Sequence, residues 1–131
     1  MGKIVSSEKI VDGATGVKVY LRRLFADETI TYGDVKVVIF ELVQNGNFQK
    51  MFGELGEKRR CWKNKEEALA FAEQNTEKLG PNSNFFELEG GFVANVNLDG
   101  DGQPYVNFVS PLSNDSAWYA GFQPRVFYPQ Q

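Results

Sequence analysis

The sequence contains no histidine and only one cysteine, Cys61, among its 131 residues. Histidine is the side chain whose charge changes near neutral pH, and zinc sites are built largely from cysteine and histidine. These absences weigh against the commonest acid–base, metal and nucleophile chemistries, so we assign no catalytic residue and expect no cofactor. A single cysteine excludes an internal disulfide, and the start of the chain lacks the apolar run of a signal peptide, so we expect a cytoplasmic protein.

Long apolar runs and linkers are also absent. No segment approaches the roughly 18 uncharged apolar residues of a membrane-spanning helix, so we expect no membrane partner. No repeat or low-complexity tract divides residues 1–131, which form a chain of single-domain length. Aromatic residues make up 14% of the chain, a composition that favours a pleated sheet over a helical bundle. We therefore predict one α+β domain, a bent antiparallel sheet of about six or seven strands with one main helix at about 65–79.

Charge is unevenly divided along the chain. Residues 1–65 carry 12 Lys and Arg against 8 Asp and Glu, whereas residues 66–131 carry 2 against 9. A basic cluster precedes the predicted helix and consists of Lys58, Arg59, Arg60, Lys63 and Lys65. This basic cluster predicts contact with an anionic partner, nucleic acid first, because cations neutralise phosphates. The alternative is a solvated strand end whose cations face the acidic half of the same molecule.

Trp62 lies within the basic edge formed by residues 50–65 and is the candidate for stacking on an unpaired base or a terminal base pair. A tryptophan just before a helix also packs beneath that helix, so a buried ring is the alternative. Cationic neighbours would lower the pKa of the adjacent Cys61 thiol, but no histidine is available as its base. We interpret Cys61 as a small packed side chain.

Three segments of the N-terminal half have the pattern of strands. Residues 17–21 alternate between apolar and polar with a period of two. Residues 35–43 carry apolar side chains on both faces, as a strand covered on both sides does. A further strand is expected at 58–62, after a turn bracketed by Gly53 and Gly56.

Asn45-Gly46 is the strongest local signal for a turn, because both residues tolerate the positive φ of a type I′ hairpin. The hairpin makes residues 48–52 a strand and places Glu41 opposite Lys50. This opposite-charge pair and several apolar pairs agree on one register.

Asn64 begins the predicted helix, and Glu67 three positions later completes a capping box. Gly80-Pro81 ends it. Between them, apolar or small side chains recur at helical spacing and form one stripe, which consists of Ala68, Leu69, Phe71, Ala72, Thr76 and Leu79. We expect this stripe to pack across the sheet.

The acidic half is predicted to form further antiparallel strands at 84–89, 92–98 and 105–109, with a Gly90-Gly91 turn between the first two. The last twenty residues are rich in large rings: Trp118, Tyr119, Phe122, Phe127 and Tyr128. We expect this segment to wrap onto the domain. The alternative is an exposed aromatic strip that serves as a binding surface.

Residues 97–102 resemble the opening of a calcium-binding loop. Asn97, Asp99 and Asp101 supply oxygen at positions one, three and five, and Gly102 stands at position six. Phe108 occupies position twelve, where an EF-hand needs a bidentate glutamate. We favour a structural turn, because Asp and Gly are also the residues of tight turns.

Residues 35–80 present an ordered series of features: a strand Phe40-Glu41-Leu42, a glycine turn, a second strand, Phe52-Gly53-Glu54-Leu55-Gly56-Glu57, Trp62, and the helix start Lys65-Glu66-Glu67-Ala68. This series resembles the WGR domain of poly(ADP-ribose) polymerases and bacterial proteins, and the resemblance favours nucleic-acid binding. Where that family has Trp-Gly-Arg, this chain has Phe52-Gly53-Glu54, so Gly53 alone carries over and the family's arginine contact with DNA ends has no counterpart.

These observations leave three functions open. The first is a small non-catalytic binding module that contacts nucleic acid through the basic edge at 50–65. The second is a protein-interaction or inhibitor domain that uses the acidic, aromatic C-terminal half. For this function we expect a truncation after Ser116 to stay folded and to lose its partner. The third is a small-ligand carrier with a pocket between sheet and helix.

Overall fold

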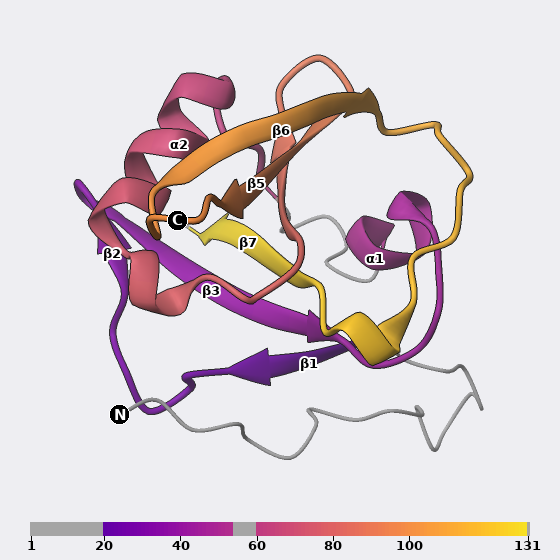
Figure 1. Cartoon of the computed structure of the whole chain (residues 1–131), viewed down its shortest axis with the longest axis horizontal. Coiled ribbons are helices and arrows are strands. Elements are labelled where there is room, and N and C mark those ends of the chain that lie inside the picture. The colour runs from indigo at the N-terminus through magenta and orange to yellow at the C-terminus, as the bar shows by residue number, and fades with distance from the viewer. Residues whose placement is uncertain (1–19, 54–59, 131) are drawn as a thin grey trace.

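The computed structural model describes residues 20–53 and 60–130 (Figure 1). Within these ranges the chain forms one seven-stranded sheet and two α-helices. The strands are β1 (Leu21–Leu24), β2 (Thr31–Tyr32), β3 (Val35–Leu42), β4 (Asn84–Leu88), β5 (Phe92–Leu98), β6 (Pro104–Pro111) and β7 (Arg125–Gln130). The helices are α1 (Phe48–Gly53) and α2 (Lys65–Gln74), and 3₁₀ turns occupy Thr76–Lys78 and Ala120–Phe122.

Strand β7 joins the two halves of the sheet. The strands lie in the order β1-β3-β7-β4-β5-β6, and β2 pairs with β3. Phe127 of β7 lies opposite Ile39 in an antiparallel pair with β3 and opposite Phe86 in a parallel pair with β4. The other strand pairs are antiparallel. The predicted α+β fold, a largely antiparallel sheet with one main helix, is confirmed.

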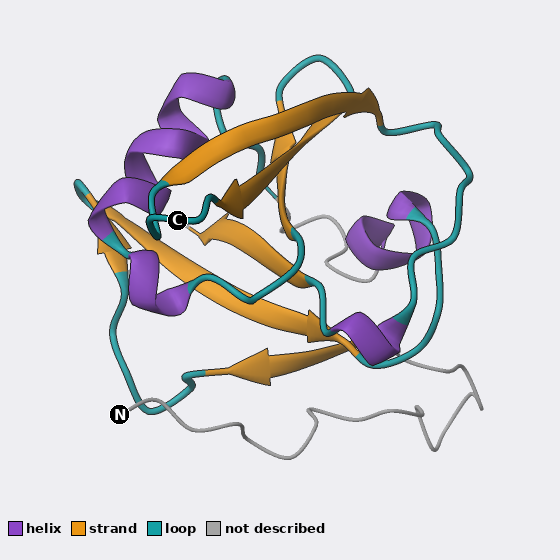
Figure 2. Cartoon of the chain, viewed as in Figure 1, coloured by secondary structure: helices purple, strands orange, loops and turns teal. Residues whose placement is uncertain are grey.

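The sheet carries a hydrophobic core on each face, and the two helices lie apart with strands between them (Figure 2). The first core lies under α2 and consists of Leu24, Ile30, Val37, Ile39, Trp62, Ala68, Phe71, Ala72, Leu79, Phe86, Leu88, Ala94, Val96 and Phe127. The second core includes α1 and consists of Leu21, Leu42, Phe48, Met51, Phe52, Phe85, Val93 and Val126. Strand β3 contributes to both cores, which confirms that it is covered on both faces.

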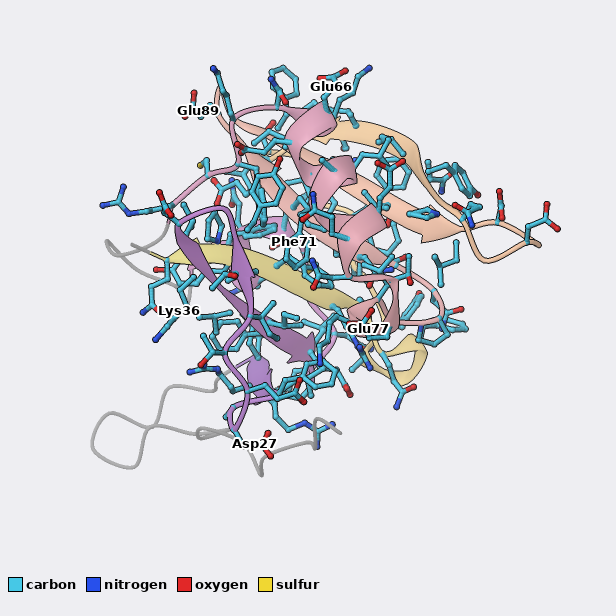
Figure 3. The ribbon with its side chains drawn as sticks, turned by 90° about the vertical axis from the view of Figure 1, so that its left-hand side faces the viewer. Asp27, Lys36, Glu66, Phe71, Glu77 and Glu89 are labelled. Atoms are coloured by element: carbon cyan, nitrogen blue, oxygen red, sulfur yellow. The ribbon has the colours of Figure 1, made fainter. Side chains whose placement is uncertain are left out.

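Helix α2 begins as its capping residues predict. The side chain of Asn64 accepts a hydrogen bond from the Glu67 backbone N–H at 2.9 Å, and the Glu67 side chain accepts one from the Lys63 N–H at 2.9 Å. The first bond satisfies a donor that a helix start leaves without a partner, whereas the second reaches the residue before Asn64 and not the Asn64 N–H of a capping box. Phe71 lies near the centre of the molecule, whereas Glu66 lies at its periphery (Figure 3). The predicted packing of the helix against the sheet is confirmed.

The helix ends earlier than the predicted limit of residue 79. Asn75 leaves the helical conformation, with φ of −139°, and its side chain donates to the Phe71 carbonyl at 3.0 Å. The following residues, Thr76–Lys78, form a 3₁₀ turn. An asparagine side chain that bonds to the backbone competes with helical hydrogen bonds, which explains the break. Leu79 still reaches the first core.

Residues 48–52 do not form the predicted hairpin strand, because they lie in helix α1. The Asn47 side chain accepts a hydrogen bond from the Lys50 N–H at 2.9 Å, as an N-cap does. Phe48, Met51 and Phe52 then fall on one face at helical spacing, and all three are buried. Gly46 forms a bridge with Trp118 instead of a tight turn.

The predicted pair of Glu41 with Lys50 is wrong for the same reason. Glu41 lies opposite Arg22 of β1 and opposite Arg125 of β7. Arg22 Nη2 donates to Glu41 Oε2 at 2.9 Å. Burial lowers the pKa of Arg125 below its usual value, and the negative charge of Glu41 acts in the opposite direction. Glu41 is therefore a buried carboxylate between two arginines.

The strands of the acidic half follow the prediction closely. β5 has the predicted limits, and β4 and β6 differ from them by a few residues. Gly90 and Gly91 have φ of 93° and 86°, which suits the predicted glycine turn. In the N-terminal half, residues 17–19 and 58–59 lie outside the described residues. The strand predicted at 17–21 is described only at its end, where Leu21 begins β1. At the end of the strand predicted at 58–62, Trp62 forms an isolated bridge with Leu88.

The aromatic C-terminal segment divides into buried and exposed rings. Phe127 and Tyr128 are buried in β7, and Trp118 is half-buried against the second core. Tyr119 and Phe122 are exposed, at 58% and 60%. Phe127, Tyr128 and Trp118 wrap onto the domain as predicted, whereas Tyr119 and Phe122 are exposed.

Candidate functional site

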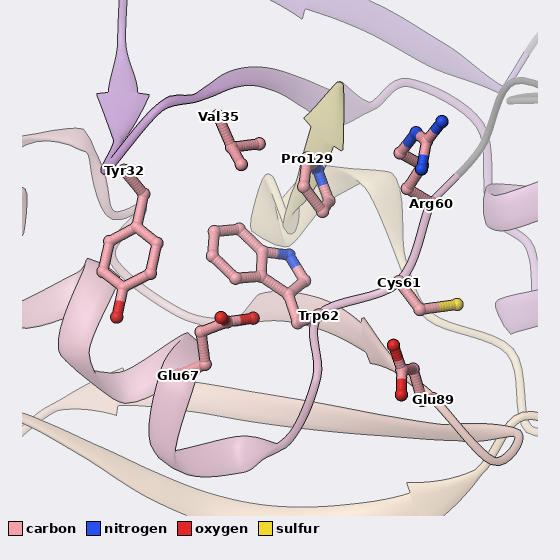
Figure 4. Close-up of a pocket in the computed structure, with 8 residues that line it drawn as sticks. All are labelled: Tyr32, Val35, Arg60, Cys61, Trp62, Glu67, Glu89 and Pro129. Atoms are coloured by element: carbon pink, nitrogen blue, oxygen red, sulfur yellow. The ribbon is translucent and has the colours of Figure 1, made fainter. Parts of the chain in front are cut away.

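The basic cluster is only partly described. Lys58 and Arg59 lie outside the described residues, and Arg60, Lys63 and Lys65 are exposed. Arg60, Glu67 and Glu89 all line a hollow of about 470 Å³, with Trp62 between Arg60 and Glu67 (Figure 4). One described cation of the cluster, Arg60, therefore shares this hollow with carboxylates, whereas Lys63 and Lys65 do not line it.

Trp62 is not available to stack on a base. Its side chain is 2% exposed, and its indole Nε1–H donates to the Phe127 carbonyl at 2.9 Å. The ring packs against Phe71 and Phe86, each with a centroid distance of 5.3 Å. The stacking role predicted for Trp62 is wrong, and the alternative of a ring packed beneath the helix is confirmed.

The hollow beside Arg60 is hereafter called the Trp62 hollow. It is lined by Tyr32, Val35, Arg60, Cys61, Trp62, Glu67, Glu89 and Pro129. Cys61 is half-buried on its wall, so the thiol is neither fully packed nor fully exposed. Behind the hollow, burial raises the pKa of the Tyr128 phenol above its usual value, and the positive charge of Arg60 acts in the opposite direction.

The calcium-like segment at 97–102 forms a turn. One carboxylate oxygen of Asp99, Oδ1, accepts the backbone N–H groups of Asp101 at 2.8 Å and Gln103 at 2.9 Å. The Asn97 side chain donates to the Asn82 carbonyl, so it also has a structural contact. The described residues contain no group of three or more His, Cys, Asp or Glu side chains placed to hold a metal ion.

A second hollow, of about 410 Å³, lies beside the exposed C-terminal rings. We call it the aromatic hollow, and its lining consists of Asn82, Ser83, Ala117, Trp118, Tyr119, Phe122 and Pro124. Tyr119 and Phe122 meet edge to face, with centroids 6.3 Å apart. They are the most exposed of the large hydrophobic side chains in the described part of the chain.

Hydrogen bonds hold the walls of the aromatic hollow in place. The Ala120 N–H donates to the Asn45 side chain at 2.8 Å, and the Asn82 side chain donates to the Phe122 carbonyl at 2.7 Å. Gln123 adopts a left-handed conformation, with φ of 57°, which turns the chain into β7. The two exposed rings are therefore carried by a fixed backbone and not by a loose loop.

Trp118 anchors the same segment to the second core. Its ring lies 4.8 Å from Phe85, 5.8 Å from Phe48 and 6.0 Å from Phe108, measured between centroids. The indole Nε1 is buried and has no hydrogen-bond partner. The Trp118 side chain thus contributes through packing, while its backbone exchanges two hydrogen bonds with Gly46.

The stretch of chain that contains the lining of the aromatic hollow carries charge of one sign. Residues 79–124 include five Asp and Glu and no Lys or Arg. Glu87 is buried, whereas Glu89, Asp99, Asp101 and Asp115 are exposed. Glu89 lines the Trp62 hollow and Arg125 directly follows Pro124 of the aromatic hollow, so this negative charge is a property of the stretch of chain.

The sequence pointed to the aromatic C-terminus but not to the other walls of the hollow. Asn82 and Ser83 precede β4 and reach the hollow only because β4 pairs with β7. The sequence signal that Tyr119 and Phe122 are exposed is their position near Gly121, in a segment that lacks the apolar–polar alternation of a strand.

Within the described residues the structure departs from the WGR-like series at the glycine turn, where Gly46 bridges to Trp118, and at the second strand, which helix α1 replaces. No helix in the described ranges is long and apolar enough to span a membrane. Comparison with known protein families, characterised proteins and solved structures finds no significant match to this chain.

Proposed function

We propose that the protein is a non-catalytic binding module whose partner is another protein. In this proposal the partner presents a short, extended, basic segment with an apolar side chain that enters the aromatic hollow. The exposure of Tyr119 and Phe122 beside that hollow is the observation that carries the proposal.

Rigid aromatic side chains suit this role. An exposed ring that becomes covered by a partner gains roughly 1.5–3 kcal/mol of hydrophobic free energy. Aromatic residues lose little conformational freedom on binding and are enriched at the energetic centres of interfaces. The hydrogen bonds from Asn45 and Asn82 reduce the cost further, because they hold the backbone of both rings before binding.

Charge supports the choice of a basic partner segment. The acidic residues of 79–124 attract lysine and arginine and repel nucleic acid and acidic peptides. Lys78 and Arg125, at the two ends of this stretch, are already engaged. Lys78 pairs with Glu28, and Arg125 donates to the Lys78 carbonyl. The net negative charge of this stretch of chain is the reason for choosing a cationic ligand.

The test is a selection from a phage-displayed library of short random peptides, with the immobilised full chain as target. We expect the selected peptides to be enriched in Lys or Arg next to an apolar residue or proline. Synthetic copies of them should bind the wild type and lose at least about tenfold in affinity for the variant with Tyr119→Ser and Phe122→Ser.

The matched control replaces two other exposed rings, Phe92→Ser and Tyr105→Ser, which are 44% and 42% exposed and do not line the aromatic hollow. The control variant should bind the selected peptides as the wild type does. Selection without enrichment, or equal binding to the variant that lacks Tyr119 and Phe122, would refute the proposal.

The nucleic-acid function predicted from the basic cluster stays a prediction. Its described cations are Arg60, Lys63 and Lys65, and the stacking ring it called for is buried.

A further inference from the structure

The Trp62 hollow is a second candidate site, independent of the aromatic hollow. Four segments that are distant in sequence build it: the β2–β3 hairpin, the residues before α2 together with its first turn, the end of β4, and the end of β7. Its volume of about 470 Å³ suits a small molecule.

The walls of this hollow are apolar and aromatic. Tyr32 and Val35 stand on one side, Pro129 closes another, and the edge of the Trp62 ring lies between them (Figure 4). The centroids of the Tyr32 and Trp62 rings are 5.9 Å apart. Such walls favour a ligand with an apolar part, because that part is removed from water on binding. They do not distinguish between ligands of different charge.

Charges of both signs stand at the rim. Figure 4 shows the guanidinium of Arg60 near Pro129, whereas the carboxylates of Glu67 and Glu89 lie on the other side of Trp62. A ligand with only a negative charge meets two carboxylates, and a ligand with only a positive charge lies beside Arg60. A ligand with one charge of each sign satisfies both sides of the rim.

Hydrogen bonds hold the backbone beside the charged groups and orient one of the two carboxylates. The Trp62 N–H donates to the Glu87 carbonyl at 2.8 Å, and the Glu89 N–H donates to the Trp62 carbonyl at 2.9 Å. This bridge fixes the backbone of Arg60 relative to that of Glu89. Glu67 is oriented by the hydrogen bond that it accepts from the Lys63 N–H. A carboxylate that is oriented before binding lowers the entropic cost of pairing with a ligand.

We propose that the Trp62 hollow binds a small zwitterion, with an amine and a carboxylate at the two ends of a short apolar body. The ligand carboxylate pairs with Arg60, and the ligand ammonium pairs with Glu67 and Glu89. The apolar body lies against Trp62 and Tyr32. No bond is formed or broken.

Trp62 provides a direct reporter, because the chain contains two tryptophans. In a Trp118→Phe background the tryptophan fluorescence, excited selectively over the five tyrosines, comes from Trp62 alone. The probes are 6-aminohexanoate, hexylamine and hexanoate. We expect a saturable change with 6-aminohexanoate, and affinities at least about threefold weaker for each probe that carries one charge. The Trp62 indole N–H signal in the proton NMR spectrum of the wild type should move with the same concentration dependence.

Two variants assign the charges. Arg60→Gln should weaken 6-aminohexanoate binding and leave hexylamine binding unchanged or stronger, and Glu89→Gln should weaken 6-aminohexanoate binding and leave hexanoate binding unchanged or stronger. Lys65→Gln and Glu66→Gln are the matched controls, because both residues are exposed and neither lines the hollow. Absence of saturation, equal affinity for the three probes, or equal losses in the controls would overturn the proposal.

Discussion

The two tryptophans bring the same indole group to two different cores. Trp62 donates its N–H to the Phe127 carbonyl, whereas the N–H of Trp118 is buried without a partner. A buried donor without a hydrogen bond costs about 1–3 kcal/mol, so Trp118 gives up part of the stability that its packing provides. The aromatic contacts of Trp118 outweigh this cost and keep the segment before β7 attached.

This difference leads to a prediction for two equivalent substitutions. Trp62→Phe removes a buried hydrogen bond and creates a cavity, and we expect it to lower the free energy of unfolding by about 2–4 kcal/mol. Trp118→Phe also loses volume but removes a donor that has no partner, and we expect a loss of about 1 kcal/mol. Denaturant unfolding of both variants measures the two losses, and the comparison requires that the free energy of unfolding falls with denaturant concentration at a similar slope in both. Equal losses, or a larger loss for Trp118→Phe, would contradict this account.

Single residues were predictable where their contacts are local. Asn64 and Glu67 form the cap that their spacing indicates, because both partners lie within one helical turn. Glu41 was assigned the wrong partner, since its true neighbours come from β1 and β7. Trp62 had two interpretations, and the sequence could not choose between them because the deciding carbonyl belongs to Phe127, 65 positions away.

At the scale of elements, both α-helices begin with an asparagine cap. Asn47 accepts the Lys50 N–H at the start of α1, and Asn64 accepts the Glu67 N–H at the start of α2. A short helix has few internal hydrogen bonds, so a cap contributes a large share of its local stability. The cap at Asn47 also explains why the chain enters a helix directly after Gly46.

We predict that Asn47→Ala and Asn64→Ala each lower the free energy of unfolding by about 1 kcal/mol, because each leaves a helix N–H without its acceptor. Asn107→Ala is the matched control. Asn107 is exposed on β6, and its replacement should change stability by less than about 0.5 kcal/mol. Thermal or denaturant unfolding of the three variants provides the comparison. A control as destabilised as the two cap variants would show that the caps are not the cause.

Elements were predictable in proportion to the strength of their local pattern. α2 and β5 have a clear period and clear ends, and both were found. α1 was missed because it is only six residues long and its sequence also fits a hairpin strand. Contacts of Phe48 with Phe85 and Trp118 favour the helix. β7 was missed because its residues lack alternation, being buried on both faces.

At the scale of the whole molecule, the fold brings Arg60 of the basic half and Glu89 of the acidic half to the walls of one hollow. Arg60, Lys63 and Lys65 are interspersed with Glu66, Glu67 and Glu89 on the exposed surface around the start of α2. The surface contributed by 79–124 lacks Lys and Arg altogether. Composition revealed this division, but only the fold shows which cations have carboxylates nearby.

The nucleic-acid prediction has a test of its own at this scale. If the basic cluster holds phosphates, labelled single-stranded or duplex DNA or RNA should bind at low salt, and the affinity should fall steeply as salt rises, because bound counterions are released. The variant with Arg59→Glu and Arg60→Glu should lose the binding and remain folded, as judged by circular dichroism. Fluorescence titration gives both results. An affinity that does not fall as the salt concentration rises, or that is unchanged in the variant, would contradict the prediction.

The position of β7 in the sheet rules out the truncation expected to separate folding from binding. Removal of the residues after Ser116 would take away the strand that pairs with both β3 and β4. Phe127, at 1% exposure, would leave the first core with it. Point substitutions at Tyr119 and Phe122 are therefore the appropriate way to examine the aromatic hollow.

The same arrangement has a consequence for biosynthesis. β7 follows both of its neighbours in the chain, so β3 and β4 leave the ribosome well before the strand that connects them. Until 125–130 is made, each half of the nascent sheet has an open edge that can pair with another chain. Closure of the domain is thus a long-range event, and the sheet stays vulnerable to aggregation until β7 has been made.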